Sequence, residues 1–102
     1  MHFVKVCGIT QRDDAVAAVE NGATAIGFNF YKKSPRYIDP EQLDWAHELP
    51  ENVWRVGVFV NENPAVIRRI VDQLKLDVIQ LHGRLRAAEQ DAGDLHQGAA
   101  LE

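Results

Sequence analysis

The sequence contains one cysteine, no long apolar run and no cluster of positive charge. A single cysteine, Cys7, cannot form an internal disulfide, which predicts a reducing, cytoplasmic setting. No apolar run approaches the roughly 18 residues that a membrane-spanning helix needs, and the first residues lack the layout of a signal peptide. The net charge is −4 and the eleven lysines and arginines are scattered, which argues against nucleic acid as the main partner.

Other absences argue against a metal site, a thiol redox role and a β-hairpin. His2, His47 and His96 are not spaced as metal ligands, so the sequence predicts no metal site. Cys7 lacks the second cysteine of a Cys-x-x-Cys pair, which makes a thiol redox role the weakest interpretation. The one Asn-Gly pair follows a helical pattern and does not join two strand patterns, so no hairpin is predicted.

Strand patterns alternate with helical patterns along a chain of 102 residues, enough for one domain. The strands are predicted at 4–7, 25–30, 53–60 and 77–83, and the helices at 10–21, 39–49 and 63–74. Thr10, Asp39 and Asn63 are the predicted helix N-caps. Such alternation predicts an α/β fold with a parallel sheet and helices packed on it.

The strands have one apolar face, which we expect to contact the helices, and one face of small and polar residues. The second face is predicted to carry Lys5, Cys7, Gly27, Asn29, Gly57, Gln80 and His82. Strands sandwiched between two helical layers are apolar throughout, so this mixed face favours the inside of a barrel near its mouth. The alternative is that these are isolated strand-end residues, each satisfied by solvent.

Four segments together resemble phosphoribosylanthranilate isomerase of tryptophan biosynthesis, in order and spacing from its first strand through its fourth. They are residues 5–10, residues 27–30 with 34–38, residues 56–61 and residues 80–83. The resemblance covers about residues 3–83 and implies a (β/α)8 barrel, which typically takes about 200 residues or more. Residues 1–83 are therefore expected to form the N-terminal (βα)4 half of a TIM-type barrel, in the order β-α-β-α-β-α-β.

Residues 84–102 are expected to depart from that family. Arg84 stands where the family usually has an acidic residue. Residues 84–92 are predicted to form a short helix, with a disordered, strandless tail beyond it. A frameshift, or a vector remnant at Leu101-Glu102, would explain such a tail.

The resemblance also implies an activity, an Amadori rearrangement of a phosphorylated aminosugar without a cofactor. It assigns the general base to Cys7, the anthranilate carboxylate to Arg36 and a place in the pocket lining to His82. Lys5, two residues from Cys7 on the same strand face, is also a predicted substrate-binding residue and could favour the thiolate. The family's general acid, an aspartate on a later strand, and its phosphate-binding loops are expected outside this chain, which alone is then expected to be inactive.

Each of these residues also has a structural alternative. Cys7 could be a small buried hydrophobic residue, Lys5 a strand-end charge, Arg36 a solvated loop charge and His82 a strand-end hydrogen-bonding group. A second function remains open as well, a non-catalytic half-barrel scaffold. Two exposed sheet edges would then drive self-association, most simply into a homodimer.

Overall fold

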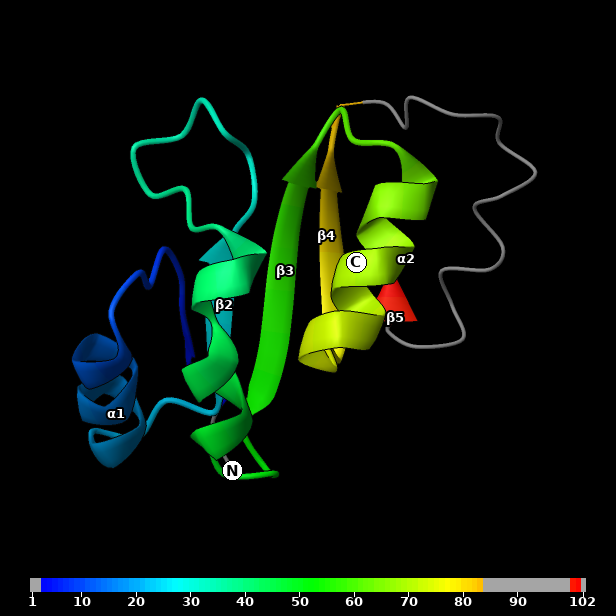
Figure 1. The fold of residues 1–102 in the computed structure, drawn as a ribbon. Helices are drawn as coiled ribbons and strands as arrows, with labels where there is room; N and C mark the ends of the chain where they lie inside the picture. Colours follow the sequence, from blue (N-terminus) through cyan, green and yellow to red (C-terminus); the bar gives the residue numbers. More distant parts are fainter. Residues whose placement is uncertain (1–2, 84–99, 102) are drawn as a thin grey trace.

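The computed structural model describes residues 3–83 and 100–101 (Figure 1). Its elements in chain order are β1 (Lys5–Val6), α1 (Arg12–Glu20), β2 (Ala25–Asn29), the 3-10 helices η1 (Pro40–Gln42) and η2 (Asp44–Glu48), β3 (Trp54–Val60), α2 (Pro64–Leu74), β4 (Val78–His82) and β5 (Ala100–Leu101). The sheet order follows the chain, β1-β2-β3-β4-β5, and every neighbouring pair is parallel. The predicted parallel α/β fold is thus confirmed.

The helices cover one face of the sheet, and the main core lies beneath them (Figure 1). Ile26 and Phe28 of β2 are fully buried there, together with Ala15 of α1 and Ile67 of α2. A smaller apolar cluster, Ala25, Val56 and Val78, lies on the other face of the strands. This second face carries the mixed residues that the sequence places on it, with one exception.

Gly57 is that exception, because it faces the helices. It pairs with Phe28 in the register of β2 and β3. A Cβ built on Gly57 would lie 2.6 Å from Leu76 Cδ1 and 3.1 Å from a ring carbon of Phe30, both core residues. The prediction for Gly57 was wrong because alternation alone does not tell which side of a strand faces the helices. The pairing register with the neighbouring strand decides that, and the sequence does not show the register.

The predicted helix over 39–49 is instead two short 3-10 helices separated by Leu43, whose φ of −108° and ψ of 27° are not helical. Pro50 has no N–H to close an α-helical bond to the Ala46 carbonyl. That carbonyl accepts a 3.0 Å hydrogen bond from Arg55 Nε, and Arg55 Nη2 reaches the Leu49 carbonyl at 2.9 Å. Arg55, only 8% exposed, thereby ties this segment to β3.

Two of the three predicted N-caps are confirmed. The Asp39 carboxylate accepts from the Glu41 N–H at 2.9 Å, and the Asn63 amide oxygen accepts from the Ala65 N–H at 2.8 Å. Thr10 is not a cap, because α1 starts one residue later, with Gln11 at the cap position and no side-chain bond there.

The structure describes only residues 100–101 of the predicted tail. Ala100 and Leu101 form β5, which pairs in parallel with Val78 and Ile79 of β4. The prediction that no strand follows β4 was therefore wrong. The predicted helix over 84–92 and the rest of the tail lie outside the described residues.

Candidate active site

The thiol of Cys7 lies on the face of the sheet opposite the helices, just beyond the end of β1. A Cβ built on Gly27 of the neighbouring strand would be 3.1 Å from Cys7 Sγ, so the sulfur occupies the space that a side chain at position 27 would fill. The Gly27 carbonyl accepts from the Gly8 N–H at 3.1 Å, which fixes the turn after Cys7. Cys7 is exposed, so it is not the buried hydrophobic residue of the alternative interpretation.

Arg36 lies over Gly8, the residue that follows Cys7. A Cβ on Gly8 would be 2.8 Å from Arg36 Nη1, and Gly8 has a φ of +76°, so only glycine suits this close approach. The loop that carries Arg36 is held by its own polar groups. Asn29 Oδ1 accepts from the Tyr31 N–H at 2.9 Å, and Ser34 Oγ accepts from the Arg36 N–H at 3.1 Å. Residues 31–38 thus bring a guanidinium back to the carboxyl end of β1.

Lys5 and His82 lie outside this close group. Lys5 precedes Cys7 by two residues in an extended segment, so both side chains take the same face. His82 is exposed at the end of β4, three strands from β1. The register places Val78, four residues before His82, in the row of Gly27 and Cys7, so His82 does not lie directly across the sheet from the thiol. The structure thus brings Arg36 to the turn after Cys7, places Lys5 on the same strand face as Cys7 and leaves His82 three strands away.

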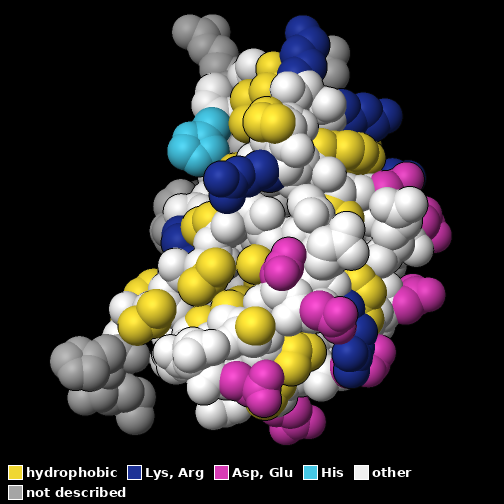
Figure 2. Space-filling model, turned by 90° about the vertical axis from the view of Figure 1, so that its left-hand side faces the viewer, with side chains coloured by type: hydrophobic (Ala, Val, Ile, Leu, Met, Phe, Trp, Pro, Cys, Tyr) yellow, Lys and Arg dark blue, Asp and Glu magenta, His cyan; other side chains and the backbone are white. Residues whose placement is uncertain are grey.

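On the α1 side of the molecule, basic side chains gather at the carboxyl edge of the sheet (Figure 2). Figure 2, which views the molecule from its α1 side, shows basic groups mostly in the upper part of that face and acidic groups mostly in the lower part. The upper loop contributes Lys32, Lys33 and Arg36, whereas Asp13 and Asp14 lie in the first turn of α1. This separation suits a ligand that carries carboxylate or phosphate charge.

The hydroxyl group of Tyr37, near the end of this loop, has a raised pKa. Burial, and secondarily the carboxylate of Asp39, raise the pKa of Tyr37 above its ordinary value of 10.0. The folded chain therefore holds this proton more tightly than the unfolded chain. The stability that results is complete below pH 10.0 and is lost as the pH rises through the folded-state pKa.

We expect the free energy of unfolding to fall more steeply above pH 10.0 in the wild type than in Tyr37→Phe. Urea titrations of both proteins across that range measure the difference. Tyrosinate absorbance followed in parallel should show the late-ionising group disappear in the variant. Identical pH profiles for the two proteins would contradict the assignment.

No group of three or more His, Cys, Asp or Glu side chains among residues 3–83 and 100–101 is arranged to hold a metal ion. Nor does this described part contain a helix that is long and apolar enough to cross a membrane. The candidate site presents a thiol, a guanidinium and an ammonium, from Cys7, Arg36 and Lys5.

Comparison with known proteins shows which family the chain belongs to. The model of the N-(5'-phosphoribosyl)anthranilate isomerase family matches residues 4–97. The chain belongs to this family. The N-(5'-phosphoribosyl)anthranilate isomerase of Thermotoga maritima is 53% identical over 81 residues, which are 78% of this chain and 40% of that relative. The chain thus spans about two fifths of the length of this relative.

Solved structures of the isomerase agree with the fold. One, a complex with reduced 1-(o-carboxyphenylamino)-1-deoxyribulose 5-phosphate, has a TM-score of 0.86 at 43% identity and covers 99% of this chain and 52% of its own. Another, described as mutually generated monomers of the dimeric Thermotoga maritima isomerase, has a TM-score of 0.84 at 42% identity and covers 99% and 50%. The half-barrel assignment is confirmed, and the family match runs past residue 83, where sequence analysis ended the resemblance.

Sequence reasoning missed the residues that position the isomerase candidates. Gly8 allows the Arg36 side chain to approach the backbone closely, and Gly27 leaves room for the Cys7 thiol. Ser34 accepts a hydrogen bond from the Arg36 N–H and so holds the loop backbone. The bond from Asn29 to the N–H two residues on is an Asx-turn, and an asparagine at a strand end is a signal that could have predicted it.

Proposed function

We propose that the protein to which these residues belong isomerises N-(5'-phosphoribosyl)anthranilate by an Amadori rearrangement in tryptophan biosynthesis. The main support is the exposed Cys7 thiol beside Arg36 in a chain of this family. The ligand of the related solved structure carries a carboxyphenyl group and a phosphate, which fit the basic carboxyl edge. We also propose a cytoplasmic location, which the single cysteine supports.

In the proposed mechanism, Cys7 is the general base. A general acid from a later strand protonates the ribose ring oxygen, and the ring opens to an iminium between the anthranilate nitrogen and C1. The Cys7 thiolate removes the proton from C2, and the electron pair of that C–H bond neutralises the iminium. The resulting enol becomes the ketone by taking up a proton at C1 and releasing one from its hydroxyl, so the proton count balances.

Arg36 and Lys5 have supporting tasks in this mechanism. The planar guanidinium of Arg36 can bind the anthranilate carboxylate through two parallel hydrogen bonds, which orients the substrate beside the thiol. Lys5, two residues before Cys7 on the same strand face, adds a positive charge on the substrate side of the sheet. His82 contributes to the pocket lining from the other side of the opening.

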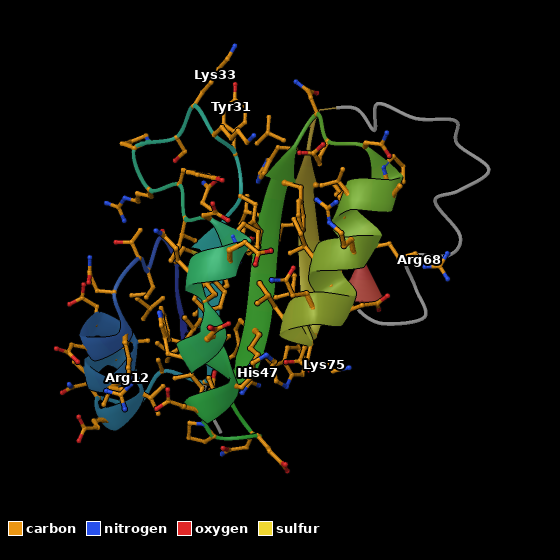
Figure 3. All side chains as sticks on the ribbon, viewed as in Figure 1. Arg12, Tyr31, Lys33, His47, Arg68 and Lys75 are labelled. Atoms are coloured by element: carbon orange, nitrogen blue, oxygen red, sulfur yellow. The ribbon has the colours of Figure 1, made fainter. Side chains whose placement is uncertain are left out.

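The test joins residues 1–83 to the second half of the Thermotoga maritima relative. We expect Cys7→Ala to lower kcat about 10²- to 10⁴-fold, the usual contribution of a general base. Arg36→Ala should chiefly raise KM, because it removes a carboxylate ligand. Lys33→Ala is the matched control, since its side chain points away from the sheet at the tip of the same loop (Figure 3). Cys7→Ala with nearly full kcat would rule out the assigned base.

Self-association is a second property that the surface favours. Phe3, Val4 and Trp54 are 64%, 43% and 49% exposed, and the rings of Phe3 and Trp54 meet edge to face at 6.0 Å. They lie at the amino ends of β1 and β3, and β1 is an edge strand of the described sheet. We propose that this aromatic patch and the β1 edge form a homodimer interface, in a family with a dimeric member.

We expect light scattering after gel filtration to give the mass of a dimer for the wild-type chain. Trp54→Ser should shift the equilibrium to monomer, because aromatic anchors dominate interface energies. Ala65→Ser, at an exposed position of α2, should leave the dimer unchanged. A wild-type monomer at micromolar concentration would exclude this interface.

A further inference from the structure

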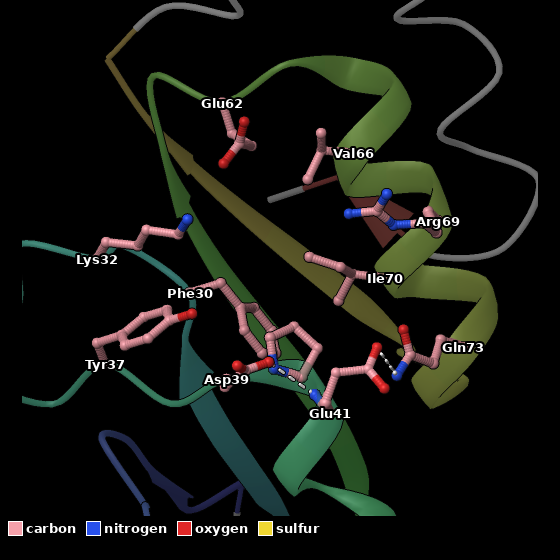
Figure 4. Close-up of a pocket in the computed structure, with 11 residues that line it drawn as sticks. Phe30, Lys32, Tyr37, Asp39, Glu41, Glu62, Val66, Arg69, Ile70 and Gln73 are labelled. Carbon is pink, nitrogen blue, oxygen red and sulfur yellow. Dashed lines mark hydrogen bonds between the residues drawn. The ribbon is translucent and has the colours of Figure 1, made fainter.

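A cavity of about 480 Å³ opens on the helix side of the sheet, between the loop after β2, η1 and α2 (Figure 4). Its volume falls within the range of about 300–1,000 Å³ that small-molecule sites occupy. Its apolar wall includes Phe30, whose ring packs on Phe59 at 5.3 Å in the core under the helices. Cys7 lies on the opposite face of the sheet, so this cavity is not the proposed isomerase site.

Two cations reach this cavity from opposite walls. Lys32 extends from the loop after β2, and Arg69 extends from α2, with both charged ends directed toward the space between them (Figure 4). Within the described part of the chain, neither has a hydrogen bond or an ion pair. Their charges are available to a carboxylate.

Three acids line the same cavity, and each is only partly engaged. Asp39 Oδ1 accepts from the Glu41 N–H at 2.9 Å, and Glu62 Oε1 accepts from the Asn63 N–H at 2.8 Å. Glu41 Oε1 accepts from Gln73 Nε2 at 3.4 Å. Each carboxylate has a second oxygen left, and none of the three forms an ion pair with a described lysine or arginine. An ammonium group therefore finds acceptors here.

The cavity thus offers unpaired charge of both signs beside an apolar wall made by Phe30, Val66 and Ile70. A purely anionic ligand would be repelled by three carboxylates, and a purely cationic one by Lys32 and Arg69. A ligand with both charges close together meets neither penalty. We propose that this cavity binds a free α-amino acid with an apolar side chain, its carboxylate on Lys32 and Arg69 and its ammonium on the acidic residues.

The experiment titrates the 102-residue chain with leucine and phenylalanine and follows backbone amide shifts by NMR. We expect shifts confined to residues 30–41, to residues 62–63 and to α2. Leucinamide lacks the carboxylate and N-acetyl-leucine lacks the ammonium, so each should bind at least about 10-fold more weakly, as expected when a charge-assisted hydrogen bond is lost. Glycine, which lacks the apolar side chain, should also bind more weakly.

Arg69→Gln should weaken leucine binding about 10-fold or more, because it removes the carboxylate partner on α2. Arg68→Gln is the matched control, since Arg68 lies on the same helix and points away from the cavity (Figure 3). Far-ultraviolet circular dichroism checks that both variants fold. Absent shifts at millimolar leucine, equal binding of leucinamide, or equal losses from Arg68→Gln and Arg69→Gln would each overturn the proposal.

Discussion

The 102-residue chain by itself is expected to convert N-(5'-phosphoribosyl)anthranilate at least about 10⁴-fold more slowly than residues 1–83 joined to the second half of a relative. A missing general acid alone costs about 10² to 10⁴ in rate. Phosphate binding supplies further energy for holding the substrate against Cys7 and Arg36, and the resemblance assigns it to later strands.

Kinetic assays of the chain and of the joined protein, with matched enzyme concentrations, measure this difference. Rescue of a tryptophan auxotroph provides a second readout. The control adds the separately produced second half to the chain, which should recover part of the rate if the two halves associate. Turnover by the chain alone within about 10-fold of the joined protein would show that one half holds a complete acid-base pair.

Arg55→Met is expected to destabilise the fold by about 3 kcal/mol. The guanidinium donates to the Ala46, Leu49 and Val53 carbonyls at 3.0, 2.9 and 3.3 Å. Methionine keeps the apolar stem but no donor, and each buried carbonyl left without a partner costs about 1–3 kcal/mol. The Ala46 carbonyl keeps a 3.3 Å hydrogen bond from the Leu49 N–H, which keeps the total at the lower end of that range. Because small domains have only about 5–15 kcal/mol in total, a large share of the stability would be lost.

Urea unfolding followed by circular dichroism measures this loss. Arg12→Met is the matched control, since Arg12 pairs with Glu48 at 3.2 Å where both side chains are more than half exposed. An exposed ion pair contributes about 0–1 kcal/mol, so this variant should remain close to the wild type. Equal losses from Arg12→Met and Arg55→Met would show that the buried hydrogen bonds contribute little.

The order of elements was predictable because its signals are local. The caps at Asp39 and Asn63 are each made within two residues of the helix start, and the apolar stripe of α2 has helical spacing. The helix predicted over 39–49 is interrupted at Leu43 and stops before Pro50, and its anchoring to the sheet is non-local. Arg55, in the next strand, donates hydrogen bonds to the Ala46 and Leu49 carbonyls, and nothing within residues 39–49 predicts that partner.

The candidate site likewise has some features that local sequence predicts and others that depend on long-range contacts. The face taken by Cys7 follows from strand alternation, and the resemblance selects Arg36. The proximity of Arg36 to the turn after Cys7 depends on the loop folding back to Gly8, and this is a tertiary contact that no local pattern predicts. The face of Gly57 depends on the register of β2 and β3, and β5 depends on chain segments that carry no strand pattern. Local chemistry was therefore predictable, whereas long-range pairing was not.

The empty position at Gly27 has an evolutionary consequence. The sulfur of Cys7 fills the volume that any side chain at 27 would claim, so the two strands share a single space. A larger residue at 27 is compatible only with a smaller one at 7. Among descendants of this chain, positions 7 and 27 should therefore change as a pair, and a lineage that keeps the thiol should keep the glycine.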